Sequence, residues 1–249
     1  MDTDTTRFEA ARWRVIGTEK KRLSIGTMSE KSLHAILKYY CEPNEDQHEI
    51  PIDRFVADIY RDGTITEIQT RQFGRMREKL AVYLDQYQVT VVYPIALQTW
   101  VSWIDDQTGE IKNRRLSPRK GNLYSIFPEL YQIKQFLTHP NFRFRILQMN
   151  VDEYRILDGY GKHKKIRATK FDRVPQCLVD ELLIERPEDY LQFLPYELDG
   201  VFTTKEFANS AKISPELARY TLYILLEVGL VKRAGKKGKA FLYECALEA

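Results

Sequence analysis

The stretch VADIYRDGTITEIQT, residues 56–70, contains two runs of alternating apolar and polar residues, one on each side of Asp62-Gly63. An Asp-Gly pair between such runs predicts a β-hairpin with a two-residue type I′ turn. Pairing then proceeds outward from the turn and places Asp58 directly opposite Glu67. Two opposed carboxylates repel each other unless a positive charge neutralises them. The hairpin therefore predicts a cation-binding site; the alternatives are that the pair lies on a solvated hairpin face, or that one acid meets an arginine.

A divalent cation would suit these two acids. Mg²⁺ prefers oxygen ligands and is commonly bound by one or two carboxylates together with waters and phosphate oxygens. Such an ion polarises a phosphodiester and activates a water. Asp58 and Glu67 are therefore the expected ligands of Mg²⁺ or Mn²⁺.

The segments around the hairpin predict an alternation of helices and strands. GTMSEKSLHAILKYYC (26–41) predicts a helix that begins near Thr27, and Glu30 completes a capping box with it. Its apolar face consists of Leu33, Ile36, Leu37 and Tyr40. A short strand is expected at 49–53, ahead of the hairpin. After the hairpin, a helix is expected at 71–87, with Phe73, Met76, Leu80, Tyr83 and Leu84 on one stripe.

The next segments continue the pattern. The β-branched run QVTVVYPIA (88–96) predicts a strand that is buried on both faces. A second hairpin is expected at 97–117 with its turn at Asp106–Gly109, then a helix at 125–140 and a strand at 141–150.

The element order and the two acids together resemble the PD-(D/E)XK nuclease superfamily, across roughly residues 23–96. The resemblance implies that Asp58 is the first motif acid and that Glu67-Ile68-Gln69 is the (D/E)XK triplet. Many members add a glutamate from the first helix, a role that Glu30 would fill. On the sequence alone, Glu30 is equally well explained as half of the capping box.

Gln69 departs from the family pattern, which has lysine at this position. The lysine ammonium orients the attacking water and offsets negative charge, whereas Gln69 would orient this water by hydrogen bonds but brings no charge. Some members carry the basic group on the following helix. Lys79 is the expected replacement, with Arg71 and Arg75 as weaker candidates, and all three are equally consistent with a solvated helix face. The substitution leaves open the loss of catalysis.

From residue 185 onward the pattern changes to short helices at 186–195, 203–212 and 214–229, followed by two strands around a basic glycine-rich tip. TTKEFANSAKISPELARYTLYILLEVGLVKRAGKKGKAFLYE resembles winged helix-turn-helix domains over its whole length. Ser214-Pro215 would open the recognition helix and Gly229 would end it. On that helix Arg219 is the main base-reading candidate. The wing carries Lys232, Arg233, Lys236, Lys237 and Lys239. A winged helix also serves as a protein-docking or dimerisation module, so the fold does not fix the function.

Two further basic clusters suit a phosphate backbone. IKNRRLSPRKG (111–121) includes Arg114 and Arg115, and GKHKKIRATKFDR (161–173) includes Lys164 and Lys165. The second is expected as a lead-in or exposed loop. Either cluster would equally be explained as a solvated loop tip.

The composition sets wider limits. The net charge of +3 is small, so any nucleic-acid signal has to come from local clusters. Three distant cysteines indicate a reducing compartment without a disulfide framework, and no run reaches the length of a membrane span. We therefore expect a cytoplasmic protein.

The sequence predicts an α/β fold: a mixed-sheet nuclease-like core (αβββαβ) in residues 1–184, and a small winged-helix α+β domain in residues 185–249. The expected function is metal-dependent processing of DNA, with a homodimer as one expected assembly. The alternatives are a catalytically inactive nuclease fold that binds DNA, and a protein-interaction factor that binds no nucleic acid.

Overall fold

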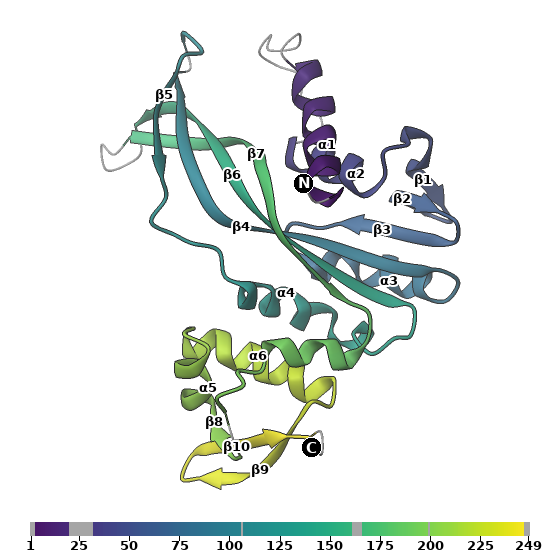
Figure 1. Cartoon of the computed structure of the whole chain (residues 1–249), viewed down its shortest axis with the longest axis vertical. Coiled ribbons are helices and arrows are strands. Elements are labelled where there is room, and N and C mark those ends of the chain that lie inside the picture. The colour runs from purple at the N-terminus through teal and green to yellow at the C-terminus, as the bar shows by residue number, and fades with distance from the viewer. Residues whose placement is uncertain (1–2, 20–31, 106, 161–165, 199, 247–249) are drawn as a thin grey trace. The chain divides into compact units, whose positions relative to one another are not determined.

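The structure is a computed structural model, and it describes residues 3–19, 32–105, 107–160, 166–198 and 200–246. The chain forms two compact units and passes between them several times. The first unit consists of Met1–Arg61, Pro94–Gly121 and Ile146–Glu181, and the second of Asp62–Tyr93, Asn122–Arg145 and Leu182–Ala249. The fold is mixed α/β with one large mixed sheet and one small sheet (Figure 1).

Within the described residues the large sheet has seven strands, hydrogen bonded in the order β1-β2-β3-β4-β6-β7, with β5 paired to β4. Their bounds are β1 His48–Ile52, β2 Phe55–Arg61, β3 Thr64–Ile68, β4 Gln88–Asp105, β5 Ile111–Leu116, β6 Phe142–Tyr160 and β7 Ile166–Ile184. β1 and β2 are antiparallel, whereas β3 and β4 are parallel, with Glu67 beside Val91. The sheet is therefore mixed, as the sequence predicts.

The turn between β2 and β3 has the predicted length. β2 ends at Arg61 and β3 begins at Thr64, so two residues connect them. Asp62 (φ 47°) and Gly63 (φ 80°) both have positive φ, as a type I′ turn requires. The prediction that Asp58 faces Glu67 concerns residues of different units, and it stays a prediction.

A helical crossover joins the parallel strands β3 and β4. It consists of η2 (Phe73–Met76) and α3 (Arg77–Leu84). The predicted apolar stripe is buried in full: Phe73, Met76, Leu80, Tyr83 and Leu84. The β-branched run at the start of β4 buries Val89, Val91 and Val92 completely. These apolar contacts fix α3 against the strands that it connects.

Helices α1 (Thr3–Glu19) and α2 (Ser32–Cys41) belong to the first unit. The predicted face of α2 is buried at Leu33, Ile36, Leu37 and Tyr40. Phe8 of α1 packs edge-on against Tyr40, with ring centroids 5.5 Å apart. The buried carboxylate of Asp172 on β7 accepts hydrogen bonds from the backbone N–H and the hydroxyl of Ser32. A strand residue therefore satisfies a backbone donor at the start of this helix.

The first unit also includes the 3₁₀ turn η1 (Glu45–Gln47), and the second unit contains further helical segments and the small sheet. The elements are η3 Leu123–Ile126, α4 Phe127–Leu130, η4 Tyr131–Phe136, η5 Pro187–Phe193, α5 Thr204–Ser210, α6 Pro215–Glu227, β8 Phe202–Thr203, β9 Val231–Lys237 and β10 Ala240–Cys245, the strands lying in the order β8-β10-β9 (Figure 1). Ser214 accepts a hydrogen bond from the Leu217 N–H at the start of α6, as predicted. Gly229 (φ 80°) follows its end, and Leu230 N–H donates to the Leu225 carbonyl.

Four sequence expectations differ from the structure. The hairpin expected at 97–117 is confirmed, since β4 pairs antiparallel with β5, but its first strand continues the strand expected at 88–96 without a break. The helix expected at 125–140 is divided into short turns, because Ile133 has non-helical angles (φ −122°, ψ 20°). The helix expected at 186–195 is the 3₁₀ segment η5. Residues 166–173 belong to β7 and are not a loop, because Lys170 and Arg173 pair with buried Glu153 on β6.

Among the described residues, no helix is both long and apolar enough to cross a membrane. Cys41, Cys177 and Cys245 are free thiols.

Candidate functional site

Glu67 and Lys79 form an ion pair in the second unit. Lys79 Nζ lies 2.6 Å from Glu67 Oε2, with 18% of the lysine side chain and 6% of the glutamate side chain exposed. Glu67 lies on β3 beside buried Ile68, and Lys79 precedes buried Leu80 on α3. The Lys79 ammonium also lies 5.7 Å from the centre of the Tyr83 ring, one helical turn further along. Lys79, the expected replacement for the triplet lysine, therefore contacts Glu67, the predicted triplet acid, directly.

Gln69 follows the end of β3 and has a different bonding pattern. Its backbone N–H donates to the Val92 carbonyl over 2.9 Å, which extends the parallel pairing by one residue. Its side-chain Nε2 donates to the Arg71 carbonyl over 2.6 Å. The amide that was expected to orient a water thus closes the turn between β3 and η2.

Asp58 lies on β2 in the first unit, and its partner is a histidine. His34 Nε2 of α2 lies 3.3 Å from Asp58 Oδ2, with side-chain exposures of 28% and 22%. The sequence alone predicts no role for His34, because the four histidines are far apart along the chain. One feature of the sequence could have indicated a role for His34. It follows Leu33, the first apolar residue of α2, and so lies at the edge of the buried face of this helix.

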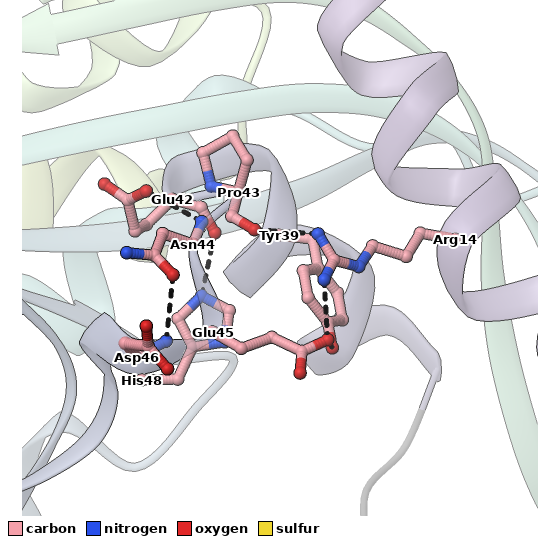
Figure 2. A network of polar contacts seen from close by, with 8 residues as sticks. All are labelled: Arg14, Tyr39, Glu42, Pro43, Asn44, Glu45, Asp46 and His48. Carbon is pink, nitrogen blue, oxygen red and sulfur yellow. Dashed lines mark hydrogen bonds and ion pairs between the residues drawn. The ribbon is translucent and has the colours of Figure 1, made fainter.

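A polar network fixes the turn that leads from α2 to β1 (Figure 2). Arg14 of α1 donates to the Pro43 carbonyl and to Glu45 Oε1, each over 2.8 Å. The Tyr39 hydroxyl donates to the same Glu45 oxygen over 2.5 Å, and this bond together with Arg14 lowers the pKa of Glu45. His48 Nε2 contacts the Glu42 carbonyl at 2.7 Å. The network ties α1, the end of α2 and the start of β1 together, and so fixes the helix that carries His34.

The described residues do not by themselves form a metal site. No three His, Cys, Asp or Glu side chains of the described part of the chain gather so that they could hold an ion. The carboxylates of Asp58 and Glu67 are suitable donors for Mg²⁺ or Mn²⁺. However, they lie in different units, and Lys79 already neutralises Glu67. Glu30, the third expected acid, lies outside the described residues. Metal binding therefore stays a prediction.

The β9–β10 hairpin, which we call the wing, carries a cluster of cations on an aromatic ring. Arg233 Cζ lies 4.3 Å and Lys236 Nζ 4.9 Å from the centre of the Phe241 ring. Residues three apart on a strand normally point to opposite faces. Here Gly235 pairs with Leu242 and Arg233 with Tyr243, so Ala234 is an extra, bulged residue. The bulge brings Arg233 and Lys236 to the same face, over the same ring.

The other predicted cations of the wing are exposed. Lys237 and Lys239 lie at its tip, and Lys232 pairs with Glu244 at 3.4 Å. The cation–π contacts hold two of the five charges in place while their heads stay in water.

Two arginines of β5 also stack on aromatic rings, in the first unit. Arg114 lies 4.9 Å from the Trp100 ring and forms an ion pair with Asp152 at 2.9 Å. Arg115 lies 4.8 Å from the Trp103 ring. Arg114 is therefore partly neutralised. Lys164 and Lys165, also predicted to bind nucleic acid, lie outside the described residues.

Arg219 lies exposed on α6, where the sequence predicts a base-reading residue. Its neighbours on the outer face of the helix are Glu216, Tyr220 and Tyr223. Tyr220 and Tyr223 pack against Tyr131 of η4. A segment of the same unit thus already contacts part of the face that would read bases.

Comparisons with known proteins give a family but no activity. A family model described as "Domain of unknown function (DUF8091)" matches residues 31–185, so α1 and the elements from η5 to β10 lie outside the match. A protein of Treponema pallidum (strain Nichols), with the printed name "Uncharacterized protein", is 27% identical over 222 residues. The alignment covers 89% of this chain and 87% of that relative. No solved structure matches the chain.

Proposed function

The chain belongs to the family described as domain of unknown function DUF8091, and on that premise we propose from its geometry that it binds DNA, with the wing holding the phosphate backbone. The observation that carries the proposal is the pair of cations, Arg233 and Lys236, on the Phe241 ring. Exposed cations on a hairpin suit phosphates, which are contacted without regard to sequence.

The order of elements supports a winged-helix assignment for residues 185–249. The helical segments η5, α5 and α6 precede the β9–β10 hairpin. Strand β8 pairs with β10 of this hairpin and completes a three-stranded sheet. Capping residues delimit α6 at both ends, as expected of a recognition helix between a turn and a wing. On this proposal the wing supplies most of the affinity, because the outer face of α6 includes the acids Glu216 and Glu227 beside Arg219.

The test is the binding of a labelled 20-base-pair duplex by fluorescence anisotropy. A variant with Arg233→Gln and Lys236→Gln should bind at least tenfold more weakly at low salt, because two phosphate contacts are removed. The matched control, Arg54→Gln with Arg186→Gln, removes the same charge from two exposed positions outside the wing and should retain wild-type affinity. Wild-type protein that does not bind duplex even at low salt would rule out the proposal and favour a protein-interaction factor.

A second candidate function, hydrolysis of phosphodiesters, is favoured by the contact of Lys79 with Glu67. The strand order β1-β2-β3-β4, with β3 and β4 parallel across α3, also agrees with the αβββαβ core of the PD-(D/E)XK nucleases. Lys79 supplies the basic group that the triplet lacks, and such a group offsets the charge of a transition state.

Plasmid cleavage in Mg²⁺ or Mn²⁺ tests this candidate. Cleavage that is lost in Asp58→Ala and Glu67→Gln would support it. If wild-type protein binds DNA without cleaving it, the nuclease-like core is a scaffold for binding.

A further inference from the structure

The outer face of α6 has a hollow of about 270 Å³ in the second unit. Its walls are formed by Tyr131, Glu216, Arg219, Tyr220 and Tyr223. Tyr131 comes from η4, and the other four residues lie on one face of α6 at positions spaced three or four residues apart. The volume is slightly below the range of typical small-molecule sites, so it suits a ligand with a single ring system.

Contacts among the rings hold the aromatic wall in place. The Tyr131 ring meets Tyr220 at 5.5 Å and Tyr223 at 4.7 Å between centroids, with interplanar angles of 73° and 72°. Edge-to-face packing of this kind fixes the planes of the three rings.

Lys134 places a positive charge against the same rings. Its ammonium lies 4.9 Å from the Tyr131 ring and 4.4 Å from the Tyr223 ring, and it donates a hydrogen bond to the Tyr223 hydroxyl. This hydrogen bond raises the pKa of Lys134, so the side chain is a cation at neutral pH. A ligand at this wall meets aromatic faces and a positive charge together.

The rim adds a donor and an acceptor. Arg219 and Glu216 are both exposed and lie three residues apart on α6. A guanidinium donates to phosphate oxygens, and a carboxylate accepts from the amino and ring N–H groups of a nucleobase. A nucleotide presents a planar ring, edge donors and a phosphate, and so complements each of these groups.

We propose that this hollow binds one unpaired nucleobase with its phosphate, the base stacking on the tyrosines. The inference rests on the proposed function, from which it takes nucleic acid as the class of ligand. It assigns the outer face of α6 to a single strand or a free nucleotide. Tyr131 packs on Tyr220 and Tyr223 and so covers part of the face that a duplex would contact. The hollow beside it therefore holds a single base that has left the duplex. The wing contacts the backbone.

The test uses three probes with the full chain. The first is a twelve-nucleotide single strand with one central 2-aminopurine, whose fluorescence reports stacking, and the second is a pair of mononucleotides, dGMP and dAMP. The third is the blunt 20-base-pair duplex. The variants are Tyr220→Leu and the exposed substitution Arg219→Gln, with Tyr196→Leu as the control, since Tyr196 is 90% exposed and lies outside the hollow.

Wild-type protein should quench the 2-aminopurine. Tyr220→Leu and Arg219→Gln should each bind the single strand about tenfold more weakly, as is typical when a stacking side chain is lost. Tyr196→Leu should match wild type. Saturable binding of dGMP or dAMP that depends on the same residues would support the site and would identify a free nucleotide as its ligand.

The proposal is overturned if neither single strand nor mononucleotide binds, or if both variants bind every probe as tightly as wild type. Because Arg219 is exposed, Arg219→Gln keeps the test valid if Tyr220→Leu fails to fold. The wing variant separates the two proposals. If it loses duplex binding while the hollow variants change nothing, the proposed function stands and the hollow is only a surface feature.

Discussion

Lys79 Nζ on α3 contacts Glu67 Oε2 on β3 at a distance of 2.6 Å. Both side chains are mostly buried, so little water can solvate the charge of one side chain if its partner is removed. Removing one member of a buried pair leaves an uncompensated charge, which is costly even where the intact pair contributes little.

Lys79→Met should therefore lower the free energy of unfolding by about 3 kcal/mol. Glu67→Gln should cost a similar amount, and the double variant should cost clearly less than the sum of the two. Urea denaturation of the four proteins measures this coupling. Arg75→Met, an exposed cation of the adjoining η2, should change stability by less than about 0.5 kcal/mol. Strict additivity of Lys79→Met and Glu67→Gln would show that the two groups do not interact in solution.

Glu153 is a second buried acid whose charge is balanced by cations. Its side chain is 4% exposed and contacts Arg155 at 2.5 Å and Lys170 at 3.0 Å. Burial acts to raise the pKa of Glu153, but the hydrogen bonds from Arg155 and Lys170 outweigh burial and lower it below 4.5. We expect Glu153→Gln to destabilise the protein at pH 7, because the cations lose their shared partner.

This difference in stability should depend on pH. A carboxyl whose folded pKa is depressed stabilises the protein fully above its unfolded pKa, and the contribution disappears as the pH falls through the folded pKa. The gap between wild type and Glu153→Gln should therefore be constant between pH 6 and 7 and should shrink below about pH 4.5. Thermal unfolding across this range measures it. A gap that widened in acid would contradict the assignment.

Gly121 is a position where a side chain cannot be accommodated. A Cβ atom there would lie 2.2 Å from the Ala96 carbonyl oxygen, while the Gly121 N–H donates to Leu97 over 3.0 Å. Gly121→Ala should therefore destabilise the protein by about 2 kcal/mol or more, because backbone has to move. The control is Gly17→Ala within α1, where the nearest atom is 3.9 Å away, and it should stabilise the protein by up to about 1 kcal/mol. Equal effects of the two substitutions on the melting temperature would rule out the close approach.

The local features of the fold were predictable because local chemistry determines them. The Asp62-Gly63 turn, the apolar stripe of α3 and the caps of α6 depend on residues that are close in sequence. The length of β4, β6 and β7 was not predictable, since it depends on pairing with distant strands. The division of residues 123–136 into short helical turns was also not predictable. Residues 125–140 have a helical sequence pattern, and the backbone angles at Ile133 interrupt it.

The candidate site divides in the same way. The lysine on α3 was predictable, since helical spacing from the end of β3 brings it back over the strand. His34 beside Asp58 was not, because the docking of α2 on β2 joins residues of unrelated segments. The stacking of Arg233 and Lys236 on one ring also could not be foreseen, because alternation places them on opposite faces unless Ala234 bulges.

The wing separates the contributions of charge and of the aromatic platform. Neutralising Lys237 and Lys239, which lie at its tip, should reduce the slope of log affinity against log salt by about 2 for duplex DNA. Phe241→Leu removes the ring beneath Arg233 and Lys236 but keeps every charge. It should weaken binding several-fold because the two cations lose their fixed positions, and it should leave the salt slope unchanged. Anisotropy titrations between 50 and 200 mM salt, about the range over which phosphate contacts change affinity most visibly, distinguish the two effects. If Phe241→Leu lowered the slope as far as the lysine variant does, the ring would be controlling the number of phosphate contacts and not their geometry.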